Sequence, residues 1–211
     1  GSFNQYFIGD FDGSMFTPDD HSTRFMDMGK DFYAFQSFVN SPDSFVYGIA
    51  WASNWQYAAF TPTHPWRSSM SITRKLYLKD HQPNPETTLL TLVSEPIVNW
   101  SHLKIQNAVN KGNFALSKEN PLVFKCKQPN SLLSFKVSWK LTAVELSLTE
   151  QTNWTLNFIS SYGRDEFISL GYDPTASACF INRGNCNEPF VKENPFFTDK
   201  MSCYLEPVNG V

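Results

Sequence analysis

The stretch KDFYAFQSFVNSPDSFVYGIAWASNW, residues 30–55, decides the fold prediction. It contains two runs in which apolar or aromatic residues alternate with polar or small ones. A Ser-Pro-Asp-Ser sequence at residues 41–44 separates the two runs. Alternation with a period of two is typical of β-strands that bury one face. The stretch therefore predicts two antiparallel strands joined by a turn.

Similar strand patterns lie on both sides of this stretch. NQYFIGDFDGSMF, residues 4–16, places an Asp12-Gly13 pair between two alternating runs, which is a strong hairpin signal. RSSMSITRKLYLK, residues 67–79, predicts a further strand. No window of twelve residues has an apolar period of 3.6, so helices should be few and short. Residues 1–79 are thus predicted to form a four-stranded antiparallel unit.

The second half of the chain begins after a change in composition. KDHQPNPET, residues 79–87, has two prolines and no apolar residue, so residues 80–87 are predicted to be a linker. Alternating runs then resume, with turn sequences between them, and predict an antiparallel β-sandwich over residues 88–211. A lone four-stranded sheet would expose an apolar face. We expect the first sheet to be one module of a repeating array such as a propeller, or to pack directly on the sandwich.

Composition limits the class of partner. A net charge of −3 provides no basic surface for nucleic acid, and no run approaches the roughly 20 apolar residues of a membrane span. No nucleic-acid or membrane partner is therefore predicted. Aromatic residues make up 16% of the chain, with 19 Phe, 8 Tyr and 6 Trp. This composition fits a carbohydrate-handling protein and fits an aromatic-cored β-sandwich equally well.

The sequence contains four cysteines and two N-glycosylation sequons, which allow disulfides and glycosylation but do not show that either occurs. None of the four cysteines, Cys126, Cys179, Cys186 and Cys203, has the paired spacing of a zinc site, so no metal site is predicted. A hairpin could bring Cys179 and Cys186 together, and free thiols fit equally well. The triplets that begin at Asn99 and Asn153 are candidate N-glycosylation sites.

No assembled catalytic set is visible in the sequence. Asp12 precedes a glycine and is most simply a turn residue. Asp27 and Asp31 flank a Met-Gly-Lys segment, where they would cap a turn or pair with Lys30. The four histidines have no ligand-like or triad-like partner nearby in the sequence. There is no Gly-x-Ser-x-Gly elbow and no glycine-rich phosphate loop, so no cofactor is predicted.

Tryptophans gather between residues 51 and 66. Trp51 and Trp55 are four residues apart, so on a regular strand they would share a face. Indole rings stack on the apolar faces of sugars, and they also fill protein cores, so both roles are open. Trp66 and Arg67 are expected to be structural, with the guanidinium bonded to loop carbonyls.

The same window carries a resemblance to a known family. The series GKDFYAFQSF at residues 29–38 and GIAWASNWQYAAFTPTHPWRSSMSITRKLYL at residues 48–78 resembles the fungal invertases and inulinases of glycoside hydrolase family 32. FVKENPFFTDKMS, residues 190–202, is similar to the same family. The resemblance implies an all-β fold, a five-bladed β-propeller followed by a β-sandwich. Residues 1–79 would be the C-terminal part of the propeller with its last blade, and residues 88–211 an incomplete sandwich.

The resemblance also implies a function and a localisation. Family members hydrolyse terminal fructofuranosides of the sucrose and inulin type with retention. The family's Asn-Asp-Pro-Asn-Gly, Arg-Asp-Pro and Glu-Cys motifs do not occur in this sequence, so no catalytic residue is assigned and the chain alone is expected to be inactive. The implied sugar-contacting residues are Trp55, Trp51 and Asn4. A secreted β-fructofuranosidase piece is expected, with a possible homo-oligomer through the sandwich. The alternative is a non-catalytic carbohydrate-binding or structural protein derived from an invertase.

Overall fold

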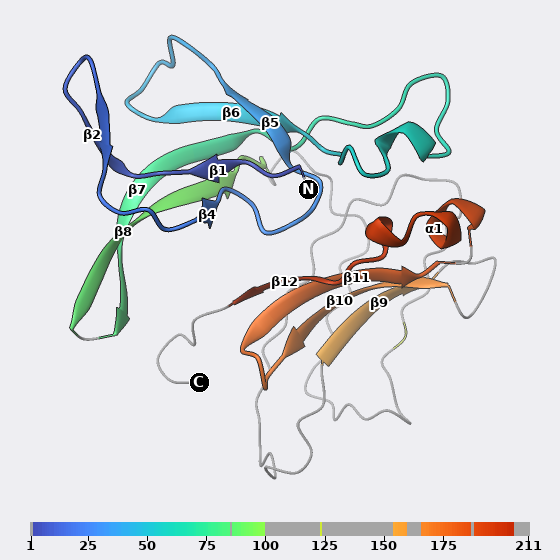
Figure 1. The fold of residues 1–211 in the computed structure, drawn as a ribbon. Coiled ribbons are helices and arrows are strands. Elements are labelled where there is room, and N and C mark those ends of the chain that lie inside the picture. Colours follow the sequence, from blue (N-terminus) through green and yellow to red (C-terminus); the bar gives the residue numbers. More distant parts are fainter. Residues whose placement is uncertain are drawn as a thin grey trace. The chain divides into compact units, whose positions relative to one another are not determined.

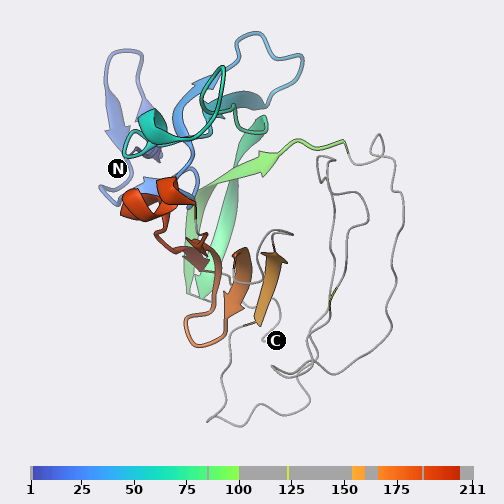
Figure 2. The ribbon, with the colours of Figure 1, turned by 90° about the vertical axis from the view of Figure 1, so that its right-hand side faces the viewer.

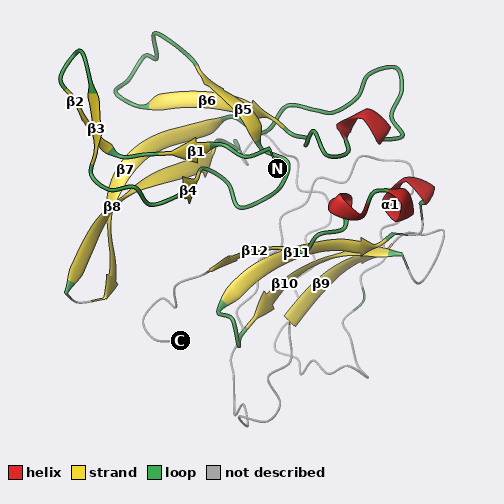
Figure 3. Ribbon diagram, in the orientation of Figure 1, coloured by secondary structure: helices red, strands yellow, loops and turns green. Residues whose placement is uncertain are grey.

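A computed structural model describes residues 2–84, 86–99, 123, 154–159, 166–186 and 188–204. The chain divides into two compact units, residues 1–98 with 147–211 and residues 99–146, and the elements below belong to the first. Nearly all of the regular structure in the described residues is β-strand (Figure 3). The nearly all-β class predicted from the alternating patterns is confirmed.

The N-terminal residues form two small antiparallel pairs. β2 (Gly9–Phe11) pairs with β3 (Phe16–Pro18), and β1 (Gln5–Tyr6) pairs with β4 (Arg24–Phe25). At the tip of the β2–β3 hairpin, Asp12 Oδ1 accepts hydrogen bonds from the backbone N–H groups of Ser14 (2.8 Å) and Met15 (2.7 Å). Gly13 has a φ of +96°, which residues with a side chain rarely adopt. The predicted hairpin and the turn role of Asp12 are confirmed.

The larger sheet has four antiparallel strands in the order β5-β6-β7-β8 (Figure 1). The strands are β5 (Tyr33–Ser37), β6 (Val46–Trp51), β7 (Arg74–Asn84) and β8 (Thr87–Pro96). β5 and β6 are the two strands predicted from residues 30–55, and their pairing is confirmed. Residues 4–16 supply no strand to this sheet, because its fourth strand comes from β8.

The predicted linker at residues 80–87 is largely a hairpin. β7 continues to Asn84, β8 starts at Thr87, and these two residues are cross-strand partners. Only the first part of β7, residues 74–76, also pairs with β6, so the rest of the β7–β8 hairpin extends past the other strands (Figures 1 and 2). The last residues of β7, 79–84, are polar, and a hairpin end tolerates proline. The proposed division of the chain into propeller and sandwich domains stays a prediction.

The second sheet has the order β12-β11-β10-β9 (Figure 1). Its strands are β9 (Trp154–Ile159), β10 (Phe167–Asp173), β11 (Ala178–Asn185) and β12 (Met201–Tyr204). A turn at residues 174–177 joins β10 to β11, and Asp173 Oδ1 accepts two backbone hydrogen bonds there. Residues 100–122 and 124–153, which belong to the predicted sandwich, lie outside the described residues.

Helices are short, as predicted. They are α1 (Pro189–Glu193) and two 3₁₀ turns, η1 (Ala58–Phe60) and η3 (Pro195–Phe197), in the described part of the chain. None of the helical segments described is long and apolar enough to cross a bilayer. The best-buried apolar side chains of the first 98 residues lie beside the larger sheet, and they are Phe32, Ala50, Tyr57 and Ala58.

Candidate sugar-binding site

Two indole rings meet where β6 ends. Trp51 is the last residue of β6, and Trp55 follows in a turn, so the two do not share a strand face as predicted for a regular strand. The turn nevertheless brings the rings together, with centroids 4.9 Å apart and a tilt of 55°. Trp51 is half-buried and donates its indole N–H to Ser68 Oγ. Trp55 is 69% exposed, so it is not a core residue and presents a free aromatic surface.

The turn between the two rings is built on Asn54, whose side chain is completely buried. Asn54 Nδ2 donates to the carbonyl of Lys30 (2.9 Å), and Asn54 Oδ1 accepts from the backbone N–H of Gln56 (3.1 Å). The backbone N–H of Trp55 donates to Ser2 Oγ (3.3 Å). A buried amide with both polar atoms bonded fixes local geometry, because breaking either bond would leave an unsatisfied polar group. The position of Trp55 is therefore set by the fold.

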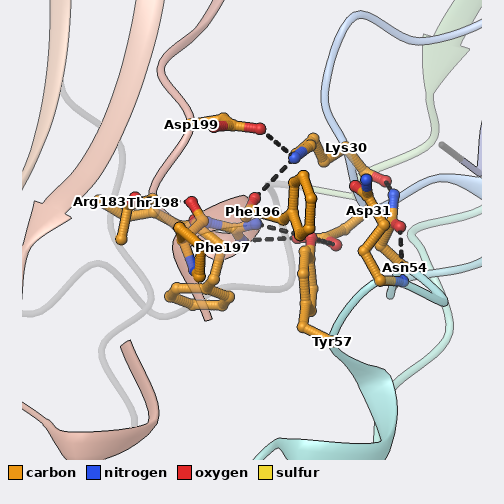
Figure 4. Close-up of polar contacts among 11 residues, drawn as sticks. Lys30, Asp31, Asn54, Tyr57, Arg183, Phe196, Phe197, Thr198 and Asp199 are labelled. Carbon is orange, nitrogen blue, oxygen red and sulfur yellow. Dashed lines mark hydrogen bonds and ion pairs between the residues drawn. The ribbon is translucent and has the colours of Figure 1, made fainter. Parts of the chain in front are cut away.

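A charged cluster lies beneath this turn and joins it to β11 (Figure 4). Tyr57, 1% exposed, donates its hydroxyl hydrogen to Asp31 Oδ1. Arg183 donates from Nη1 to Asp31 Oδ2 and from Nη2 to the Tyr57 hydroxyl, each at 2.6 Å. The guanidinium also lies 3.8 Å from the centroid of the Phe197 ring. Burial, and then the hydrogen bond to Asp31, raise the pKa of the Tyr57 hydroxyl, so it stays protonated and can donate.

Lys30 makes a second connection between the same two parts of the chain (Figure 4). Its side chain is 7% exposed, and Nζ donates to the carbonyl of Phe196 (2.6 Å) and forms an ion pair with Asp199. Asp27 and Asp31 were predicted to cap a turn or to pair with Lys30; the ion pair is not formed, because Lys30 pairs with Asp199, and the capping role is confirmed for Asp27. Asp27 instead accepts from the backbone N–H of Gly29 (2.7 Å) and from Arg74 Nη2 (3.0 Å). Partners more than 150 residues away give no signal in local sequence patterns.

Asn4 lies against the start of β5. Its Nδ2 donates to the carbonyl of Phe32 (3.0 Å), and its Oδ1 accepts from the backbone N–H of Phe35 (3.1 Å). The β5–β6 register shifts between Tyr33 and Gln36, so the Asn4 amide bonds to backbone groups at an irregularity in the ladder. Asn4 thus has a positioning contact in the structure, and its predicted contact with a sugar stays a prediction.

The remaining predicted residues lie elsewhere. Trp66 is 73% exposed, so it fills no core. Asn99 is exposed, and Asn153 lies outside the described residues, so the two sequons stay predictions. Sequence reasoning singled out the two indole rings and missed Tyr57 and Arg183. The only available signal for Tyr57 was its place in the aromatic-rich segment.

The contacts around Asp31 fit a structural rather than a catalytic role, and the Trp51–Trp55 ring pair fits a ligand-binding one. Asp31 is held by an arginine and a tyrosine, so its carboxylate serves an ion-pair cluster rather than proton transfer. The exposed ring of Trp55, backed by Trp51, is an aromatic platform on a rigid support. Such a platform suits the apolar face of a small polar ligand such as a sugar ring.

Comparison with known proteins gives this platform a family context. Residues 1–96 match the N-terminal domain of glycosyl hydrolases family 32. The chain is 41% identical over 209 residues to an invertase of Kluyveromyces lactis and 46% identical over 208 residues to an extracellular exo-inulinase of Meyerozyma guilliermondii. Each alignment covers 98% of this chain, and 34% and 38% of the two relatives, so the chain spans well under half of their length.

Solved structures agree with these sequence matches. The β-fructofuranosidase of Schwanniomyces occidentalis complexed with fructosyl-erythritol aligns with a TM-score of 0.71 at 36% identity, over 97% of this chain and 40% of that one. A variant of that organism's fructofuranosidase complexed with fructosylnystose aligns with a TM-score of 0.68 at 38% identity, over the same shares of the two chains. The chain belongs to glycoside hydrolase family 32 and is a homologue of the yeast invertases and exo-inulinases.

Proposed function

We propose that this chain is the part of a secreted β-fructofuranosidase that forms one wall of its sugar pocket. Trp55, backed by Trp51, stacks on the apolar face of a fructofuranosyl ring. The observation that carries the proposal is the exposed Trp55 ring on a turn whose supporting amide, Asn54, is completely buried. The relatives named invertase and extracellular exo-inulinase, and the solved complexes with fructosyl compounds, favour this ligand class over other small polar molecules.

The chemistry of the complete enzyme is a retaining hydrolysis. A carboxylate attacks the anomeric carbon of the fructosyl unit, and a carboxylic acid protonates the leaving oxygen. This chain supplies shape and binding rather than those two carboxyl groups, since its sequence holds no Asn-Asp-Pro-Asn-Gly or Glu-Cys motif. Residues 1–79 then belong to the propeller with its last blade, residues 88–211 belong to the sandwich, and the sandwich offers a surface for a homo-oligomer.

Asn4 has a supporting role in this proposal. Each polar atom of its amide already has one backbone partner near β5, and an amide has further hydrogen-bonding capacity in its second N–H and second lone pair. A sugar hydroxyl close to Trp55 could use that capacity. Its substitution would then affect both the geometry of β5 and the binding of the sugar.

The test is a chimera in which these 211 residues replace the homologous segment of the Debaryomyces hansenii invertase, which is 44% identical over 209 residues. The folded chimera should hydrolyse sucrose. A stacking contact is worth about 1 kcal/mol or more, so Trp55→Ala should lower kcat/KM by about fivefold or more, chiefly through KM.

The matched control is Trp66→Ala, because Trp66 is also largely exposed but lies outside the ring pair. It should leave kcat/KM within about twofold. Equal losses in both variants, or no loss for Trp55→Ala, would contradict the assignment of Trp55. A folded chimera that binds fructose without hydrolysing sucrose would favour the non-catalytic sugar-binding protein instead.

A further inference from the structure

Two cysteines face each other across the edge of the second sheet. In the antiparallel pair β11–β12, Cys179 and Cys203 are direct cross-strand partners. Both are present as free thiols, with Cys179 exposed and Cys203 half-buried. β12 is the outermost strand of its sheet, and β11 is its pairing neighbour there (Figure 1). The two thiols are therefore brought together by backbone pairing rather than by a flexible loop.

The geometry of such a pair fits a disulfide. Directly opposite residues in an antiparallel ladder have Cα atoms about 4.5 or 5.5 Å apart and side chains on the same face. Disulfides form when the Cα atoms are about 4.4–6.8 Å apart. Both classes of opposite pair lie inside that window, so a bond between Cys179 and Cys203 requires rotation of side chains and no separation of the strands.

The pairing suggested by sequence proximity is incompatible with this fold. Cys179 lies near the start of β11, and Cys186 follows the end of that strand. Seven residues of extended chain span about 23 Å, which is far beyond the reach of a disulfide. The possibility that a hairpin joins Cys179 to Cys186 was therefore wrong. Cys126 lies outside the described residues.

We propose that Cys179 and Cys203 form a cross-strand disulfide when the protein is exposed to a disulfide oxidant such as oxidised glutathione. One thiolate attacks the oxidant's S–S bond and releases one glutathione thiolate. The second cysteine thiolate then displaces the other. The protein loses two electrons and two protons, and the oxidant becomes two glutathione molecules. A protein that passes through an oxidising compartment meets such oxidants.

The bond would fasten an edge strand that few other contacts hold. β12 has four residues and pairs only with β11 in the described sheet. Asp199, two residues before β12, is the ion-pair partner of buried Lys30. A bond at Cys203 would close a loop that contains α1, η3 and Asp199. It would therefore limit the detachment of the segment that contacts the turn carrying Trp55.

The test is differential alkylation of the complete chain with mass spectrometry. Partial desolvation of the sulfur by neighbouring atoms, and then the nearby Cys203, raise the pKa of the otherwise exposed Cys179 thiol, so the chain is incubated with a glutathione redox buffer at pH 8.5 to supply thiolate. Free thiols are then alkylated, and the protein is digested without reduction. The expected result is one linked peptide pair that contains Cys179 and Cys203, with Cys186 alkylated. The same oxidation in 6 M guanidinium should give mixed pairings, because the strand register is lost.

Variants separate this bond from other cysteine chemistry. Oxidation should raise the Tm of the original chain and of the Cys186→Ser variant by roughly 5–10 °C. It should leave the Tm of the Cys203→Ser variant unchanged, and Cys179 should then be alkylated. Persistent alkylation of both Cys179 and Cys203 in the folded oxidised chain would overturn the proposal. Linkage of either residue to Cys126 or Cys186 would overturn it as well.

Discussion

The hydroxyl of Tyr57 takes part in two side-chain hydrogen bonds at once. It donates to Asp31 and accepts from Arg183, and its ring is almost completely buried. Removing the hydroxyl would leave the partly buried Asp31 carboxylate and Arg183 guanidinium with one partner fewer. A buried polar group that loses its partner costs about 1–3 kcal/mol, and partial access to water reduces that cost for these two groups. Tyr57 therefore links the turn that carries Trp55 to the C-terminal part of the chain.

We predict that Tyr57→Phe lowers the free energy of unfolding by about 1–3 kcal/mol, measured by urea denaturation. The matched control is Tyr47→Phe, which removes a similar hydrogen bond to Asp43 (2.8 Å) at an exposed position. That control should have little effect, because water replaces the lost partner. Equal destabilisation in the two variants would contradict the role given to the cluster.

The pH dependence of stability should depend on the same hydroxyl. Its pKa is raised in the folded state above the ordinary value of about 10. A raised pKa means that the folded state favours the protonated form, so this stabilisation is fully present below pH 10. It is lost as the pH rises further toward the folded-state pKa. The difference in unfolding free energy between the original chain and Tyr57→Phe should therefore shrink above pH 10. A difference that stays constant up to pH 11.5 would contradict this.

The sequence identified some of the site residues and not others, for a physical reason. Trp51 and Trp55 were found because an excess of tryptophan in a short segment is visible without any structure. Lys30 and Arg183 were not found, because their partners lie 166 or more and 126 or more residues away. A buried charge is recognisable only by the group that neutralises it, and that group is fixed by tertiary packing.

The β5–β6 pair depends on the absence of a side chain at Gly48. A Cβ atom there would lie 2.1 Å from Phe35 Cζ and 2.6 Å from the carbonyl oxygen of Gln36. The Phe35 ring could rotate, but the Gln36 carbonyl is part of the neighbouring strand. Strand pairing at this point and packing of the Phe35 ring therefore both require glycine.

We predict that Gly48→Ala lowers the free energy of unfolding by about 1–3 kcal/mol or more. It should also weaken the protection of the β5–β6 backbone amides against hydrogen exchange. Gly184→Ala in β11 is the control. Its nearest contact is the flexible side chain of Asn182 at 3.2 Å, which can move. Urea denaturation and amide hydrogen exchange of residues 33–51 would measure the difference. If the protection of these amides is unchanged in Gly48→Ala, the strand pair accommodates a Cβ atom at this position, and glycine is not required there.

The elements also show where local patterns fail. The β2–β3 hairpin was predicted from Asp12-Gly13, because that turn is encoded in neighbouring residues. β8 was assigned to the sandwich, because the polar segment before it resembled a linker. The described residues of that segment lie at the end of the β7–β8 hairpin and pair with each other rather than with β6. Polar composition therefore indicated a hairpin end rather than an unstructured linker, and the domain boundary predicted at this segment stays a prediction.

The projecting β7–β8 hairpin has one face lined by leucines. Leu78 and Leu92 are cross-strand partners, and Leu76 and Leu90 lie on the same face by the period of two. Leu78 is 50% exposed and Leu90 is 39% exposed. A two-stranded ribbon is marginal in water unless a partner covers such a face. In a propeller, a neighbouring blade would provide that cover.

We predict that the isolated 211-residue chain self-associates through this face, so that its apparent mass in light scattering rises with concentration. The double substitution Leu78→Lys and Leu90→Lys should shift it toward monomer, because charge on an exposed strand face opposes pairing. Leu89 is 43% exposed but lies on the opposite face of the same hairpin, opposite His81.

Leu89→Lys therefore adds a charge to the same element without changing the apolar face, and it should leave the association unchanged. If all the variants associate alike, the hydrophobic surface that needs a partner lies elsewhere in the chain. If the original chain is a monodisperse monomer that unfolds cooperatively, the hairpin face needs no cover, and the argument that this sheet is one blade of a larger propeller loses its physical basis.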